Sequence, residues 1–287
     1  MICGLFGKTR QAHYKCKWNE DKLVLKHAVI VKTVEDIRLS MPRIGTRKLK
    51  FLLDTKLKTH DIKIGRDKLF DLLHDYGLLI RKRRKRKAVT TDSGHPFKKY
   101  PNLIKDIEII YPNHLWVSDI TYINLATKFC YLSLVTDAYS RKVVGFCLYP
   151  TLEKEGPLNA LKMALSDYKR FDRRVLIHHS DRGLQYCCKD YISLLKKKNV
   201  SISMTERGDP YENALAERMN GVLKSEFLYK KTFKTFDEAV EAVTASINTY
   251  NHRRPHGSCD YLTPQEAHQK NGSLRKRWKK KPTYQEL

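Results

Sequence analysis

Residues 115–148 read LWVSDITYINLATKFCYLSLVTDAYSRKVVGFCL and contain three short runs rich in β-branched and aromatic residues, at 115–123, 129–136 and 142–148. Runs of this composition with only a few residues between them are typical of neighbouring antiparallel strands. We therefore expect a three-stranded meander. Asp119 lies inside the first run, where burying a carboxylate is costly unless it is paired, hydrogen-bonded or bound to a metal.

The chain after the meander alternates between helical and β patterns. Helices are predicted at about 157–168, 189–197, 214–227 and 236–250, and strands at 174–178 and 202–204. Three strands followed by alternating helices and strands indicate a mixed α/β sheet of the ribonuclease H-like class.

The first 80 residues have a different pattern. A helix is predicted from Asn19, which can cap it, to Ser40, and a second begins at about Thr46. In a third, leucines recur at helical spacing, and Gly77 follows as its C-terminal stop. Three short amphipathic helices in a basic segment favour a small all-α helix-turn-helix domain. A generic three-helix bundle is the alternative.

The charge is strongly positive. The chain has 56 Lys and Arg against 31 Asp and Glu, a formal net charge of +25, and its first 100 residues hold 26 basic and 10 acidic side chains. Such a field attracts a polyanion, most commonly nucleic acid, although a ribosomal-type binder or a basic tail on an unrelated enzyme fits the charge too. The run RKRRKRK at 81–87 predicts a solvated linker that lies on a phosphate backbone.

Membrane and secreted classes are excluded by two features. No apolar run approaches the roughly 20 residues that span a bilayer, and the N-terminus lacks the basic region of a signal peptide. The seven cysteines have no zinc-finger spacing, so we expect them to be reduced in a cytoplasmic, nucleoid-associated protein. The predicted parts are an N-terminal remnant (1–18), a helix-turn-helix domain (19–80), a basic linker (81–110), a ribonuclease H-like core with a closing helix (111–268) and a basic tail (269–287).

Three acids stand out by position. Asp119 lies in the first strand, Asp181 follows the fourth, and Glu217 falls on the first turns of the long helix. In a ribonuclease H-like sheet these elements converge, and three carboxylates brought together raise each other's pKa values unless cations relieve the repulsion. Oxygen ligands favour two Mg²⁺ ions, with Mn²⁺ as a substitute, and such a pair suits phosphodiester chemistry. On spacing alone the alternative is three solvated surface acids.

Several motifs in the same order resemble a known family. WVSDITY (116–122), HSDRG (179–183) and NALAE (213–217) resemble the three motifs of the DDE transposase and retroviral integrase superfamily, and more narrowly those of the IS-three insertion-sequence transposases. The last two acids are 36 positions apart, as in that family. YNHRRPH (250–256) and LTP (262–264) resemble the segment that closes the family's catalytic domain.

The resemblance implies a DNA transposase of an insertion element. Asp119, Asp181 and Glu217 would be the catalytic, metal-binding residues of strand cleavage and strand transfer. Double-stranded DNA at the element ends and the target, a homo-multimer and an upstream-frame protein of the same element are the implied partners. Because the family often fuses its catalytic frame to an upstream one, we expect the isolated chain to assemble poorly.

Basic and polar residues are candidates for DNA contacts. Asn220 and Lys224 share a helix face with Glu217, where the alternative is a solvated polar stripe. The full set of candidates is Lys224, Asn220, Arg253, Arg254, Arg47, Lys48, Arg66 and Lys68. For Arg253 and Arg254 a structural salt bridge is an equal alternative. His178 and His179 are expected to pack or to orient Asp181 rather than to bind metal.

Two other functions remain open on the sequence. One is a DNA-binding repressor of the element without catalysis, and the intact acids count against it. The other is a metal-dependent nuclease without a joining step, which the predicted end-binding domain and closing segment disfavour.

Overall fold

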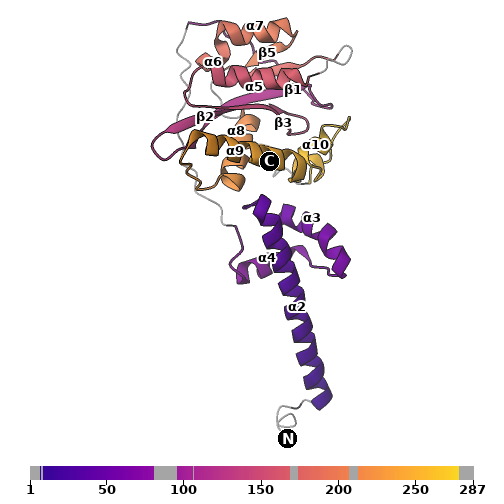
Figure 1. Cartoon of the computed structure of the whole chain (residues 1–287). Coiled ribbons are helices and arrows are strands. Elements are labelled where there is room, and N and C mark those ends of the chain that lie inside the picture. The colour runs from indigo at the N-terminus through magenta and orange to yellow at the C-terminus, as the bar shows by residue number, and fades with distance from the viewer. Residues whose placement is uncertain are drawn as a thin grey trace, which may run out of the picture. The chain divides into compact units, whose positions relative to one another are not determined.

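The computed structural model describes residues 7, 9–80, 96–105, 107–168, 174–206 and 213–277. The chain divides into two compact units, with the division between Arg83 and Arg84. The first unit is helical and the second contains the β-sheet (Figure 1). Each unit is described by itself.

The helical unit has a core of its own. It consists of α2 (Arg10–Ser40), α3 (Thr46–Leu57), the 3₁₀ turn η1 (Lys58–His60) and α4 (Arg66–Asp75). Five aliphatic side chains from these helices are completely buried: Val34, Leu49, Leu53, Leu69 and Leu73. Burying a side chain of this size contributes roughly 1.5–3 kcal/mol, so this cluster holds the three helices together.

Helix α2 begins earlier than the sequence predicted. Its N-cap is Thr9, whose side chain accepts a hydrogen bond from the Ala12 backbone N–H at 3.1 Å. The predicted cap, Asn19, lies inside the helix, so the predicted start was wrong. The stop after α4 is confirmed, because Gly77 has a positive φ of 66° and the Leu78 N–H reaches back to the Leu73 carbonyl at 2.7 Å.

The second unit is built on a five-stranded sheet. Its strands are β1 (Leu115–Asn124), β2 (Phe129–Asp137), β3 (Val143–Tyr149), β4 (Ile177–Ser180) and β5 (Ser201–Met204). The spatial order is β3-β2-β1-β4-β5, with antiparallel pairing from β3 to β1 and parallel pairing of β1 with β4 and of β4 with β5. This confirms the predicted meander and the ribonuclease H-like mixed sheet.

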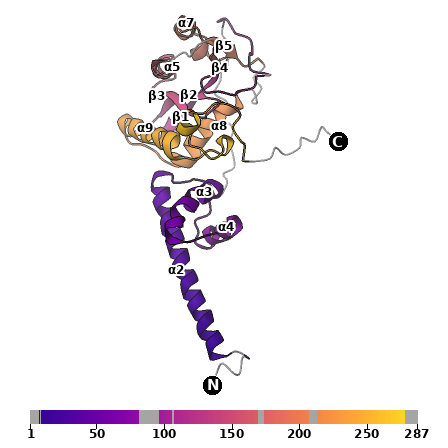
Figure 2. The ribbon, with the colours of Figure 1, turned by 90° about the vertical axis from the view of Figure 1, so that its right-hand side faces the viewer.

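Helices cover both faces of this sheet. One face carries α5 (Glu155–Ser166), α6 (Leu184–Cys187) and α7 (Lys189–Lys197), and the other carries α8 (Ala214–Val222) and α9 (Phe236–Arg253) (Figure 2). The first layer packs around Trp116 and Leu161, and the second around Val117 and Ala216. Helix α8 continues as the π-helical segment η2 (Leu223–Phe227).

Helix α5 approaches β3 unusually closely at Gly145. A Cβ atom at this position would lie 2.1 Å from the Ala160 carbonyl oxygen and 2.8 Å from the Ala164 nitrogen. Only glycine therefore permits this helix to lie against the sheet, and the contact fixes the layer that carries the first core.

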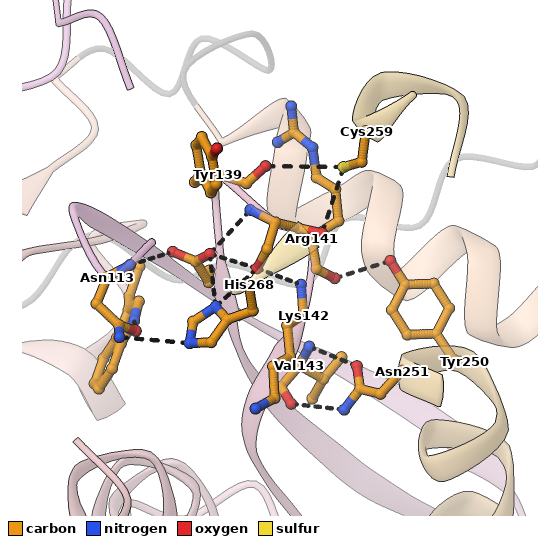
Figure 3. Close-up of polar contacts among 12 residues, drawn as sticks. Asn113, Tyr139, Arg141, Lys142, Val143, Tyr250, Asn251, Cys259 and His268 are labelled. Atoms are coloured by element: carbon orange, nitrogen blue, oxygen red, sulfur yellow. Dashed lines mark hydrogen bonds and ion pairs between the residues drawn. The ribbon is translucent and has the colours of Figure 1, made fainter. Parts of the chain in front are cut away.

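The segment after the sheet is fastened to the β2–β3 turn. The Asn251 side chain accepts from the Val143 N–H at 3.0 Å and donates to its carbonyl at 2.9 Å, and the Tyr250 hydroxyl donates to the Arg141 carbonyl at 2.9 Å (Figure 3). His268 lies 3.3 Å from the buried Asp137 carboxylate. The chain here forms the 3₁₀ turn η3 (Gly257–Cys259) and α10 (Pro264–Ala267). These contacts explain the YN pair of the closing motif.

Part of the predicted linker belongs to the sheet unit. The Leu103 N–H donates to Ser203 Oγ at 2.9 Å, and Phe97 and Tyr100 pack against the first core. Ile104 packs against the second core. The run at 81–87 lies outside the described residues.

The helices and the cysteines of the described residues also bear on the expected class of protein. Among the described residues, no helix is both long and apolar enough to cross a bilayer. The described cysteines at positions 16, 130, 147, 187, 188 and 259 form no disulfide with one another.

Candidate active site

The sheet places two of the predicted acids level with each other. Strands β1 and β4 are parallel neighbours, and their pairing runs from Leu115 opposite Ile177 to Val117 opposite His179. This offset of 62 residues is also the offset between Asp119 and Asp181. Asp119 and Asp181 therefore lie level with each other, just beyond the residues that pair between β1 and β4.

The Asp119 carboxylate is held from two sides. One oxygen accepts from the Ile120 backbone N–H at 2.9 Å, and the other accepts from Asn220 Nδ2 on α8 at 2.8 Å. Burial, together with the charges of Asp181 and Glu217, raises the pKa of Asp119 to about 7 against the lowering effect of those two hydrogen bonds. Both other acids thus act electrostatically on Asp119.

The Asp181 carboxylate is fixed by the turn that follows it. Its Oδ1 accepts from the Gly183 N–H at 3.0 Å, and Gly183 is the N-cap of α6. A Cβ at Gly183 would lie 3.0 Å from the same oxygen, closer than nearly all real Cβ contacts. The glycine therefore leaves room for the carboxylate.

We expect Gly183→Ala to reduce the DNA strand joining that the three motifs imply by up to about 10-fold, because the Asp181 carboxylate must shift by a few tenths of an ångström. Stability should change by less than about 1 kcal/mol, since the φ of −62° suits alanine. Joining assays and thermal unfolding measure the two effects. Gly221→Ala is the matched control, because a Cβ there meets nothing within 4 Å. Equal joining by both variants would contradict the prediction.

Glu217 is carried by a helix that is anchored to β1. The Asn213 side chain, at the start of α8, donates to the Ser118 carbonyl at 3.2 Å, and the Glu217 N–H bonds to the Asn213 carbonyl. Glu217 itself is exposed.

The described residues contain no ready-made group of three metal-ligating side chains. Two features support a metal at this site. All three acidic side chains offer only oxygen ligands, and a cation would relieve the repulsion by which Asp181 and Glu217 raise the pKa of Asp119.

Asn220 and Lys224 share one face of α8 and η2, and both contact residues of β1. Asn220 is 5% exposed and binds Asp119, so its amide is directed to the acid rather than to the surface. Lys224 Nζ lies 3.2 Å from Thr121 Oγ1 and 3.5 Å from the centre of the Tyr122 ring. Sequence reasoning placed Asn220 on this face but missed its contact with Asp119, since helical spacing gives no partner.

The two histidines before Asp181 belong to buried polar networks. His178 Nε2 lies 2.8 Å from Ser118 Oγ and 2.9 Å from the Tyr191 hydroxyl. Burial lowers the pKa of His178 to about 3, so the ring is neutral. His179 Nδ1 lies 2.8 Å from Ser203 Oγ. Their packing agrees with the expected structural role.

The remaining candidates for DNA contacts differ in exposure. Arg254 is 2% exposed and makes two hydrogen bonds of 2.7 Å to the Glu226 carboxylate, so the structure favours the salt bridge over a phosphate contact. Arg253, its neighbour, is exposed. Arg47, Arg66 and Lys68 are exposed and Lys48 is half-buried; all four lie at the starts of α3 and α4 in the helical unit, and Arg66 pairs with Asp67 at 2.8 Å.

Comparison with known protein families gives two overlapping matches. Residues 111–210 match one model described as an integrase core domain, and residues 198–264 match a second with the same description. Together they span the sheet, the three acids and the beginning of the closing segment.

Individual relatives extend this likeness. The chain is 32% identical to an uncharacterised 31 kDa protein of insertion element IS600 from Shigella sonnei, over 92% of this chain and 96% of that protein. It is 36% identical to the transposase InsF of IS3A from Escherichia coli, over 56% of this chain and 55% of that protein. The catalytic core domain of HTLV-2 integrase, solved in complex with magnesium, matches at 19% identity and a TM-score of 0.44, over 55% of this chain and 97% of that domain. The integrase-core matches and the insertion-element relatives show that the chain belongs to the IS3 family of insertion-sequence DDE transposases.

Proposed function

We propose that this transposase binds the ends of its insertion element and catalyses strand cleavage and strand transfer with divalent cations. The observation that carries the proposal is the placement of the three acids: Asp119 and Asp181 lie level on adjacent parallel strands, and Glu217 lies on a helix that Asn213 anchors to β1. Burial raises the pKa of Asp119, and the charges of Asp181 and Glu217 add to that rise, which a bound cation would relieve.

Asp119, Asp181 and Glu217 would hold two Mg²⁺ ions, with Mn²⁺ as a substitute. Bound there, the metals would activate an attacking oxygen and stabilise the leaving one in an in-line displacement at phosphorus. The chain's own contribution is placement: Ile120 and Asn220 orient Asp119. The reaction needs no covalent intermediate between protein and DNA, because water or a DNA 3′-hydroxyl can be the nucleophile.

The helical unit is the proposed site of end binding. Helices α3 and α4 each follow a glycine and have no side-chain cap, so N–H groups of their first turns, other than that of Lys48, which bonds to the Gly45 carbonyl at 3.0 Å, would bind phosphate oxygens. Arg47, Lys48, Arg66 and Lys68 add positive charge at these two helix starts. Lys224 and Arg253 are the proposed contacts in the sheet unit. Two DNA ends processed together would require a multimer of the chain.

The test places the gene with its native flanking DNA on a plasmid in cells, beside Glu217→Gln and Glu241→Gln copies. Newly joined element ends are amplified across their junction. We expect junctions from the wild type and from Glu241→Gln, whose residue is exposed on α9. Glu217→Gln should lower their yield by about 1,000-fold or more, since metal-dependent stabilisation of the transition state is worth several kcal/mol.

The alternatives predict different products. A repressor would give no junction from any copy while still retarding element-end DNA in a gel. A nuclease would cut pre-processed ends in the purified reaction without joining them to a second strand. Equal junction yields from Glu217→Gln and the wild type would overturn the assignment of the active site.

A further inference from the structure

Tyr186 lies next to the acidic site on the short helix α6. Its side chain is 2% exposed, and its ring packs edge-on against Tyr191 with centroids 5.4 Å apart. The His178 ring lies 6.4 Å away on another side. Because α6 starts at the Gly183 turn that binds Asp181, the position of this ring is tied to that carboxylate.

The Tyr186 hydroxyl is buried and, among the described residues, has no hydrogen-bond partner. An unsatisfied buried hydroxyl costs about 1–3 kcal/mol, and phenylalanine would avoid that cost. Tyr191, the neighbouring ring, is different, because its hydroxyl lies 2.9 Å from His178 Nε2. Packing therefore explains the Tyr186 ring but not its oxygen.

The backbone ties Tyr186 to the acidic site. The Gly183 N–H binds the Asp181 carboxylate, and the Gly183 carbonyl accepts from the Tyr186 N–H, each at 3.0 Å. In agreement with this placement, burial raises the pKa of the Tyr186 hydroxyl most, and the charges of Tyr191, Asp119 and Asp181 raise it too, so the hydroxyl is a neutral donor. Ser118, which bonds to the same His178 as Tyr191, immediately precedes Asp119, so the aromatic cluster and the acids are parts of one structure.

We propose that the Tyr186 hydroxyl is a positioning group for the acidic pair, and that it donates a hydrogen bond to one water, which in turn donates to carboxylate oxygens of Asp119 and Asp181 that do not face the bound cation. The inference rests on the proposed function, because it requires those carboxylates to hold a metal. Carboxylate ligands are commonly oriented by such outer hydrogen bonds, and losing one typically weakens metal binding by 10- to 100-fold. Asn220 and Gly183 each donate a hydrogen bond to one carboxylate oxygen, whereas Tyr186 would orient the Asp119 and Asp181 carboxylates together.

The experiment compares Tyr186→Phe, Tyr191→Phe and the wild-type full chain in the absence of DNA. Mn²⁺ binding is measured by calorimetry, and thermal unfolding is recorded with and without Mn²⁺ or Mg²⁺. Tyr186→Phe should leave the metal-free protein as stable as the wild type or more so, and weaken Mn²⁺ binding by about 10-fold. Tyr191→Phe should lower the metal-free melting temperature and leave the Mn²⁺ affinity within about 2-fold, as expected for a contact remote from the metal.

Each outcome has a distinct meaning. Metal binding by the wild type that Tyr186→Phe does not weaken would overturn the role of Tyr186 and leave the proposed function standing. A loss of affinity of equal size in both variants would also overturn it, because general loosening of the aromatic cluster would then be the cause. No binding of Mn²⁺ or Mg²⁺ by any form would overturn this inference and the metal-dependent function together.

Discussion

Replacing Asp119 by asparagine is expected to abolish strand joining and, at the same time, to stabilise the metal-free fold. The activity is lost because an amide is a poor ligand for Mg²⁺ compared with a carboxylate. The stability gain follows from the raised pKa of Asp119, about 7 in the folded protein against an ordinary value near 3.8. At pH 8 the folded chain bears a charge that its surroundings disfavour, and asparagine removes that charge.

The sign of the pH dependence is fixed by this shift. A carboxyl group whose pKa is raised by folding supports stability below pH 4, and this support is lost as the pH rises through about 7. The advantage of Asp119→Asn should therefore grow between pH 4 and pH 7 and level off above, with an upper bound of about 4 kcal/mol for a shift of roughly three units. Asn220 Oδ1, which is buried and unpaired in the described structure, can accept from the new amide.

Denaturant unfolding at pH 5.5 and pH 8, with and without Mg²⁺, measures the effect. The wild type should gain stability on adding Mg²⁺ and the variant should not. Asp167→Asn, at the exposed end of α5, is the matched control and should change neither stability nor joining appreciably. An Asp119→Asn protein that joins DNA at the wild-type rate, or that is less stable at pH 8 than at pH 5.5 relative to the wild type, would contradict the prediction.

The second large effect concerns Arg254. Arg254→Met should cost about 3–5 kcal/mol of unfolding free energy, because it removes the buried guanidinium that makes two hydrogen bonds to the largely buried Glu226 carboxylate. The double variant Arg254→Met/Glu226→Leu should recover much of that loss, since a buried ion pair is often replaced by apolar side chains at little cost. Denaturant unfolding of the three proteins gives the coupling energy directly.

Arg253 supplies the control, because it is the same residue type one position earlier and is exposed. Arg253→Met should leave stability within about 0.5 kcal/mol and weaken DNA binding, with a shallower dependence of affinity on salt. The reverse pattern, with a stable Arg254→Met protein that binds DNA poorly, would return Arg254 to the DNA-contact role.

The three-stranded meander was accessible from the sequence because it depends on local pattern. The β-rich runs around Asp119 have the short spacing of a meander, and helical periodicity marks the segments after it. The pairing that places Asp119 level with Asp181 joins residues 62 positions apart, and it was expected only through the fold class.

What the sequence did not provide depends on contacts between distant residues. The burial of Arg254 is decided by Glu226, 28 positions earlier, and an arginine in a basic chain gives no sign of it. The contact of Asn220 with Asp119 spans 101 positions. The start of α2 was missed for another reason: its first two turns are exposed, so no apolar periodicity marks them.

The contact between Asn251 and Val143 also bears on how the molecule avoids self-association. Strand β3 is the outermost strand of the meander, and an outer strand offers unpaired backbone groups to any other chain with an open edge. The Asn251 amide occupies both the N–H and the carbonyl of Val143, as a residue of a neighbouring strand would. The Asn251 side chain on α9 thus takes the place of one residue of a sixth strand. It leaves the first residue of β3 without open backbone groups at the sheet edge.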